Sequence, residues 1–215
     1  ASAYMEYVQG RVDNIFGGCY GDYDYSDSEY TGRVTYRPFL DNAFVNFRPN
    51  TYSSNAVKKV FGAGQGHTGE RDGDKCQNRS YVLIDIPQNL DKYTSLEVFG
   101  AGSYNGLGMG YTQAATTASD FDLDQASAIV DLIRGKVSAA YGASYNEGIT
   151  RRTLVNVPSG STIKIGKIFG GAYGVSNEVA CDAYEATVNY SSSDAEVSAI
   201  YGGNNSCRRT LYGTV

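Results

Sequence analysis

Six copies of one short pattern run along the chain. Each copy has an aliphatic or small residue, then an aromatic residue, then two small residues, as in Ile15-Phe16-Gly17-Gly18. The copies occupy positions 15–18, 60–63, 98–101, 140–143, 168–171 and 200–203. In five of them a β-branched residue stands three positions before the first residue of the pattern, whereas the third copy has Ser95 there. A pattern that returns along the whole chain indicates a repeat protein, most simply a solenoid.

A second pattern keeps step with the first. It is a polar residue between apolar ones, as in Phe44-Val45-Asn46-Phe47. The same form recurs at 83–86, 129–132, 154–157 and 187–190, with weaker members at 4–7 and 211–214. Alternate residues of a β-strand point to the same side, so each copy predicts a strand.

The repeat boundaries follow from the two patterns. Counted from the first strand, the repeats fall near 1–42, 43–79, 80–126, 127–152, 153–185 and 186–209, with a partial repeat at 210–215. Their lengths differ mainly after the two small residues, which is how a solenoid accepts loops on one face. A single coil cannot bury its own apolar face, so the ends of a solenoid need caps. Neither end looks like a cap, so we expect a single β-solenoid segment of a longer protein.

The patterns predict an all-β fold, a parallel β-helix (β-solenoid) of about six coils with variable loops inserted after a V-x-x-I-F-G-G motif. Coils that stack at roughly 4.8 Å place equivalent residues over one another. We expect two interior columns. The aromatic column is Phe16, Phe61, Phe99, Tyr141, Phe169 and Tyr201, and the aliphatic column is Val45, Ile84, Val130, Val155 and Val188.

Three local predictions accompany the fold. The glycine after each aromatic residue is expected at a positive φ, where the chain turns away from the stack. A bend or bulge at Gly166-Lys167 would explain why Ile163 and Ile165 alternate whereas Ile168 and Phe169 are adjacent. Residues 124–133 fit a capped helix, but the repeat register favours a strand there.

These coils resemble the right-handed parallel β-helix proteins, the pectin-lyase-like architecture. The V-x-x-I-F-G-G form at 12–18 and 197–203 is similar to repeats in large surface proteins of gut Bacteroidetes, and in a general way to the passenger regions of secreted adhesins. The resemblance implies a bacterial protein that is secreted or displayed on the cell surface. It rests on repeat style over all 215 residues, and a fold alone does not imply a function.

Composition excludes some partners. The net charge is −5 and the Lys and Arg residues are scattered, whereas nucleic-acid binding needs clustered basic residues. No apolar run is long enough for a transmembrane segment. The 26 glycines and 19 tyrosines suit turns and half-buried strands.

Two acidic clusters and a histidine are candidate sites. Residues 22–29 alternate oxygen ligands that suit a hard cation, but lack the turn glycine and distant glutamate of a calcium loop. Residues 120–124 carry three carboxylates, which would also suit a helix start. Both clusters lie in the insertions, where a solvated acidic loop is the simpler interpretation. His67, the only histidine, is interpreted as a surface residue, and no G-x-S-x-G element accompanies it.

A polar column is expected on the outer side of the strands. Its members are Asn46, Asp85, Asp131, Asn156 and Asn189. We interpret it as a ladder of side chains that bond to one another along the stack, with a ligand-binding stripe as the alternative. Asp85 and Asp131 would be neighbours, so a pair of carboxylates for glycoside hydrolysis is the sharper alternative.

Two further groups have a place on the coils. Cys181 and Cys207 precede their next strands at nearly the same position, so a disulfide between stacked coils is the candidate. Buried thiols are the alternative. Tyrosines that follow the small pairs either form an aromatic strip for sugar or protein contacts or cover the loops. They are Tyr20, Tyr23, Tyr25, Tyr104, Tyr145 and Tyr173.

The sequence therefore favours a non-catalytic, adhesin-like repeat scaffold that presents loops to an unknown protein or glycan partner. It assigns no catalytic residue, cofactor or metal site. The alternative is a carbohydrate-active β-helix enzyme, a polysaccharide lyase or hydrolase, or a glycan-binding module.

Overall fold

The computed structural model describes residues 2–20, 39–50, 57–65, 75–87, 95–103, 127–146, 148–175, 181–206 and 209–215. Every regular element in these residues is a β-strand, and every strand pairing is parallel. No helix in the described part is long and apolar enough to cross a membrane.

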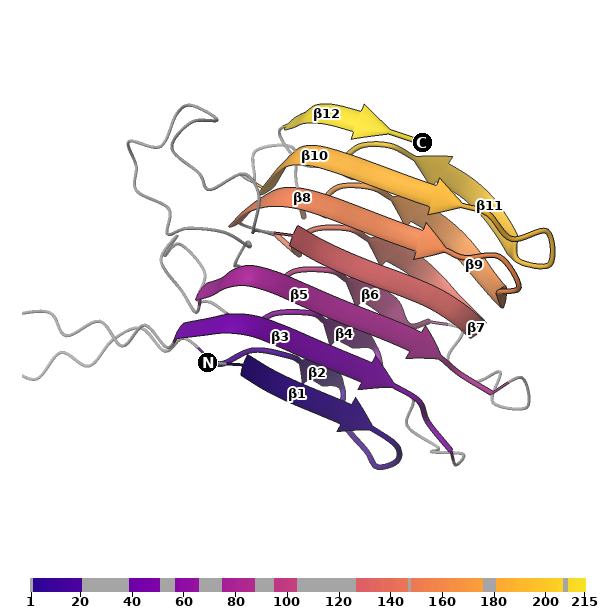
Figure 1. Ribbon diagram of the computed structural model, residues 1–215, viewed down its shortest axis with the longest axis horizontal. Coiled ribbons are helices and arrows are strands. Elements are labelled where there is room, and N and C mark those ends of the chain that lie inside the picture. Colours follow the sequence, from indigo (N-terminus) through magenta and orange to yellow (C-terminus); the bar gives the residue numbers. More distant parts are fainter. Residues whose placement is uncertain are drawn as a thin grey trace, which may run out of the picture.

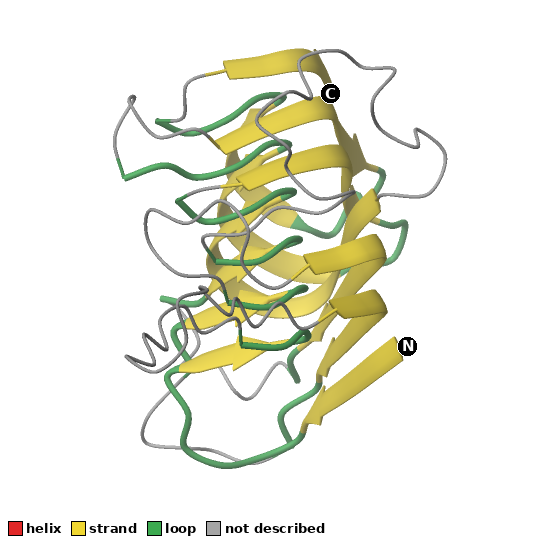
Figure 2. Ribbon diagram, turned by 90° about the vertical axis from the view of Figure 1, so that its left-hand side faces the viewer, coloured by secondary structure: helices red, strands yellow, loops and turns green. Residues whose placement is uncertain are grey.

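Two ladders of strands and one row of single bridges wrap around one axis (Figures 1 and 2), and we number them as three ladders. The first ladder contains β1 (Ser2–Tyr7), β3 (Phe39–Phe47), β5 (Lys75–Asp85), the first half of β7 (Ser127–Tyr141), β8 (Gly148–Val157), β10 (Cys181–Tyr190) and β12 (Arg209–Thr214). The second contains β2 (Asn14–Phe16), β4 (Lys59–Phe61), β6 (Glu97–Phe99), the second half of β7, β9 (Thr162–Phe169) and β11 (Glu196–Tyr201). The third is a row of single bridges through Tyr20, Gln65, Ser103, Tyr145, Tyr173 and Asn205.

Each passage of the chain through the three ladders is one coil, and the apolar core lies inside the coils. Val45, Val82, Val130, Val155 and Val188 are register partners along the first ladder and are all buried in the central core cluster. This all-β arrangement of parallel strands around an axis agrees with the β-helix-like fold predicted from the sequence.

The predicted aliphatic column is wrong at one position. Ile84 pairs with Phe47 and Leu132, and it is Val82 that pairs with Val45. The strand copy in this coil is therefore 81–84, two residues earlier than the pattern placed it. A slip of two residues keeps every side chain on its own face, and the stretch 81–86, apolar except for Asp85, accommodates both alignments.

The aromatic column exists, but on the other side of its strands. Phe99 stacks between Phe61 and Tyr141 with ring centroids 5.0 and 4.8 Å away. The residue before each aromatic, such as Val98, belongs to the central core. Successive side chains of a strand point to opposite faces, so the rings face outward and form a separate cluster. The predicted interior column is thus a stacked outer column.

Two tyrosines of the third ladder and a lysine of β4 cover the middle of this outer column. The rings of Tyr145 and Tyr173 stack on one another at 5.4 Å and meet Phe99 and Tyr141 edge-on. The ammonium of Lys59 lies over the Tyr145 ring, 4.7 Å from its centroid, and forms an ion pair with Glu97. Two of the tyrosines proposed as an aromatic strip therefore pack against the aromatic column.

The glycine after each aromatic residue is required for close packing. None of Gly62, Gly100, Gly142 and Gly170 has a positive φ, so that prediction is wrong. A Cβ added to any of them would collide with the backbone carbonyl of the corresponding glycine in the next coil. The small residue is needed because stacked backbones approach one another at this corner.

The second ladder bends where the apolar phase changes. Ile165 and Ile168 are three residues apart on β9, yet both lie in the central core, while Lys167 between them is exposed. Val137 and Ala140 show the same change of phase on β7. The change of phase at Gly166-Lys167 agrees with the predicted bend.

The stretch 124–133 is described from Ser127 onward. These residues begin the strand β7, as the repeat register favoured, rather than a helix.

The buried aromatic column predicts a loss of stability in alkali. Burial raises the pKa of Tyr141 from about 10 to about 12. The neutral phenol is favoured in the folded state, so this stability is fully present below pH 10. It declines as the pH rises from 10 to about 12, at up to about 1.4 kcal/mol per pH unit for one proton.

The Tyr141→Phe variant isolates this effect. Its free energy of unfolding, measured by urea titration between pH 9 and pH 12, is expected to fall less steeply than that of the unsubstituted chain. Parallel curves over this range would contradict the assignment of the raised pKa to Tyr141.

Candidate functional site

Part of the predicted polar column is a ladder of side chains that hydrogen-bond to one another. It lies on the outer face of the first ladder of strands. Asn189 donates from Nδ2 to Oδ1 of Asn156 at 2.9 Å, and Asn156 donates to Oδ1 of Asp131 at 3.0 Å. Asn46 instead donates to Glu6 and to the Tyr4 hydroxyl, at 3.2 Å each. Because side chains bond along the stack from Asp131 to Asn189, the ladder interpretation is confirmed for these three residues.

Asp85 is not a member of that ladder. The register places Leu83 between Asn46 and Asp131, and Asp85 pairs with Arg134. Its carboxylate accepts from Nε of Arg134 at 2.5 Å and lies 3.3 Å from Nε of Arg48. The prediction that Asp85 and Asp131 lie side by side as a catalytic pair is therefore wrong. The cause is the two-residue shift in register described above for Ile84.

Asp131 is also held by a tyrosine. The Tyr81 hydroxyl donates to Oδ2 of Asp131 at 2.5 Å. Burial raises the pKa of Tyr81 above its usual value, and the hydrogen bond and charge of Asp131 raise it further. With Tyr81 on one oxygen and Asn156 on the other, this carboxylate is engaged on both oxygens.

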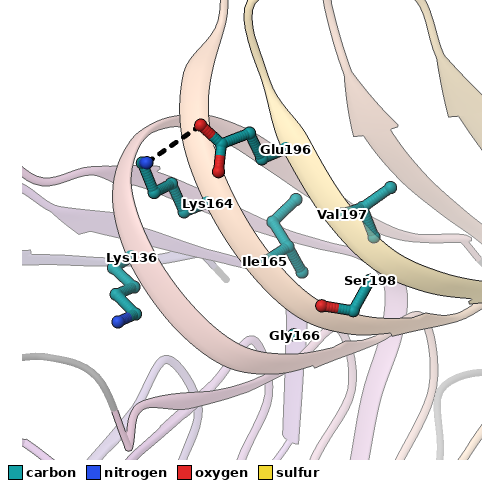
Figure 3. A pocket seen from close by; sticks show the side chains of 7 residues that line it. All are labelled: Lys136, Lys164, Ile165, Gly166, Glu196, Val197 and Ser198. Carbon is teal, nitrogen blue, oxygen red and sulfur yellow. Dashed lines mark ion pairs between the residues drawn. The ribbon is translucent and has the colours of Figure 1, made fainter.

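A depression on the second ladder collects charged side chains from three successive coils (Figure 3). We call it the lysine depression. Its volume is about 460 Å³, and it is lined by Lys136, Lys164, Ile165, Gly166, Glu196, Val197 and Ser198. Lys136 pairs in register with Lys164, and Lys164 pairs with Glu196, so the three charged side chains are neighbours on β7, β9 and β11.

Sequence reasoning missed the lysine depression, although a signal for it is present. Lys136, Lys164 and Glu196 each stand directly before a β-branched residue that the repeat pattern aligns. Aligning the residue before the apolar position, in addition to the apolar position, would place these charges side by side. The pattern follows apolar positions only and therefore does not reveal this charged column.

Several sequence candidates lie outside the described residues. They are the acidic stretches 22–29 and 120–124, His67, Tyr23, Tyr25, Tyr104 and Cys207. Within the described ranges, no group of three His, Cys, Asp or Glu side chains could hold a metal ion.

The cysteine candidate has partial support. Cys181 is buried and takes part in a disulfide. Asp182, the residue after Cys181, pairs with Arg209, the first residue of β12. The pairing with Cys207 stays a prediction.

Comparison of the chain with models of protein families, with curated proteins and with solved structures finds no match. The sites above therefore rest on their own geometry.

Proposed function

We propose that the chain is a non-catalytic, adhesin-like repeat scaffold that binds a protein or glycan partner through its outer surface and loops. The observation that carries this is the use of the carboxylates on the first ladder. Asp85 forms ion pairs with Arg134 and Arg48, and Asp131 accepts hydrogen bonds from a tyrosine and an asparagine. A general acid or base needs a carboxyl group free to reach the substrate, and these two are committed to neighbouring coils.

The repeat style supports the finer points of the proposal. About six coils carrying the V-x-x-I-F-G-G motif resemble right-handed, pectin-lyase-like β-helices and the surface proteins of gut Bacteroidetes. A disulfide at Cys181 suits a secreted or surface-displayed bacterial protein, because disulfides persist in oxidising compartments.

A glycan-binding module is the second candidate, and the lysine depression favours it. The lining of the depression combines ammonium, carboxylate and hydroxyl groups around a volume of about 460 Å³. A hollow of this size can take a small ligand, and a few well-placed polar groups are what orient such a ligand. A polysaccharide lyase or hydrolase would instead need catalytic groups that converge on one groove.

If Asp85 has a structural role only, Asp85→Asn should destabilise the fold, and the unsubstituted chain should show no polysaccharide-cleaving activity for this substitution to remove. Loss of the charge-assisted bonds to Arg134 and Arg48 is expected to lower the free energy of unfolding by about 2 kcal/mol in urea titrations. Incubation of the unsubstituted chain with neutral and acidic polysaccharides should release no new reducing ends and no unsaturated products.

The matched control is Asp194→Asn, which changes an exposed carboxylate at a bend between β10 and β11. It should alter the free energy of unfolding by no more than about 0.5 kcal/mol, as is usual for surface substitutions. Turnover of any polysaccharide that is lost in Asp85→Asn or Asp131→Asn, at unchanged fold, would refute the non-catalytic assignment and favour the enzyme.

A further inference from the structure

The second ladder carries a local excess of positive charge on an acidic chain. Lys136, Lys164 and Lys167 are all exposed on β7 and β9, and Glu196 is the acidic residue that lines the depression. Lys164 forms an ion pair with Glu196 at 2.9 Å between Nζ and Oε1. The chain as a whole has a net charge of −5, but the depression is lined by two lysines, Lys136 and Lys164, and one carboxylate, so it attracts an anion locally.

Two of these lysines stand at the spacing of adjacent coils. Lys136 and Lys164 are register partners on paired parallel strands, and such strands lie about 4.8 Å apart. Like charges on paired strands repel one another. A ligand with anionic groups close to both ammonium groups would therefore stabilise the pair. Glu196 supplies negative charge to Lys164.

Groups that suit a sugar lie beside the lysines. Ser198 offers an exposed hydroxyl at the edge of the depression, and Gly166 adds no side chain to fill it. Tyr201, three residues after Ser198 on β11, belongs to the outer aromatic column: one face of its ring stacks on Phe169 at 4.7 Å, and the residue is 46% exposed. An exposed aromatic ring with a polar tip packs well against the apolar face of a pyranose.

We propose that the lysine depression binds the carboxylate or sulfate groups of an acidic oligosaccharide that lies across neighbouring coils. Lys136 and Lys164 hold successive anionic groups, Ser198 hydrogen-bonds a hydroxyl, and Tyr201 packs against a ring. The inference rests on the proposed binding function and gives it a ligand class. It assigns this ligand to the second ladder of strands, not to the Asp131–Asn156–Asn189 ladder.

The groups beside the lysines favour a glycan over an acidic peptide. An acidic peptide would answer the charge of Lys136 and Lys164 alone, whereas a sugar also offers hydroxyls to Ser198 and a ring face to Tyr201.

The test is titration calorimetry of the full chain with four hexamers: a uronate oligosaccharide, a sulfated glycosaminoglycan oligosaccharide, a neutral glucan and hexaglutamate. At least one of the two acidic oligosaccharides should bind, with an affinity that falls as salt is raised. Lys136→Ala and Lys164→Ala should each weaken binding by about three- to fivefold, as expected for exposed ion pairs. Glu196→Gln frees Lys164 and should strengthen binding by a similar factor.

The matched control is Lys58→Ala, which removes an exposed lysine on an earlier coil that pairs with Asp13 at 3.3 Å. It should leave binding unchanged, and all four variants should melt within a few degrees of the unsubstituted chain, because the substituted side chains are exposed. The gain expected of Glu196→Gln keeps the test decisive even where a lysine variant is destabilised.

Each contrary outcome overturns the inference. Neutral glucan that binds as tightly as the acidic oligosaccharides removes the role of charge, and tighter binding of hexaglutamate makes the ligand an acidic peptide. No binding of either acidic hexamer, or binding that none of the depression variants alters, also refutes it. The scaffold function survives these outcomes and fails only if an oligosaccharide is cleaved.

Discussion

Phe99→Ala is expected to lower the free energy of unfolding by about 4 kcal/mol, within the range for truncating a fully buried phenylalanine. Phe99 has no exposed surface and stacks between Phe61 and Tyr141. Lys59 lies 5.7 Å from its ring centroid and Tyr145 meets it edge-on. Truncation leaves a cavity and removes partners from both neighbouring coils. Urea unfolding monitored by circular dichroism measures the change.

Tyr201→Ala tests the same column at its exposed end. Tyr201 stacks on Phe169 only and is 46% exposed, so the expected loss is about 1 kcal/mol. A loss as large as that of Phe99→Ala would show that stability does not come from stacking on both sides. Equal and small losses would show that the outer column contributes little.

Gly100→Ala is expected to destabilise the fold by at least about 3 kcal/mol, or to prevent folding, because overpacking against backbone has no cheap relief. The added Cβ would collide with the carbonyl of Gly142 in the next coil and lie 3.1 Å from Cβ of Ala128 on the first ladder. A long side chain moves aside, whereas the backbone of a paired coil does not. Thermal melting and yield of folded protein measure the effect.

Gly160→Ala is the matched control. Its added Cβ would have no heavy atom within 4 Å, but its φ is +82°, a left-handed conformation. The expected cost is therefore about 1–2 kcal/mol from backbone strain alone. If Gly160→Ala costs more than Gly100→Ala, close stacking is not the reason for the repeated glycines.

The sequence predicted the stacking but not which side of the strand each column occupies. In Ile15-Phe16 and its counterparts two apolar residues are adjacent, and a strand sends them to opposite faces. Nothing in the pair says which residue is inside. The choice depends on the tyrosines of the third ladder, Tyr145 and Tyr173, which give the outward rings a cover.

Register was predictable where the polar residue of a strand copy is itself a member of the polar column. Val45-Asn46-Phe47 and Val155-Asn156-Val157 meet this condition, whereas in the stretch 81–86 the only charged residue, Asp85, lies two residues after the column position, which Leu83 occupies. The misplaced register put Asp85 in the predicted polar column beside Asp131 and so suggested a catalytic pair. In the structure Leu83 occupies that position. The lysine depression could not be found from apolar positions because its charges are neighbours only after the coils are aligned.

Connections of very different length recur at one junction, between the third ladder and the next strand of the first. The connection from Tyr145 to Gly148 is far shorter than the connection from Ser103 to Ser127, although both join the same two ladders. Closing a longer loop costs free energy only logarithmically in its length. Segments of different length can therefore be exchanged at this junction at little cost in stability, and variation between coils can accumulate there while the stack remains responsible for folding.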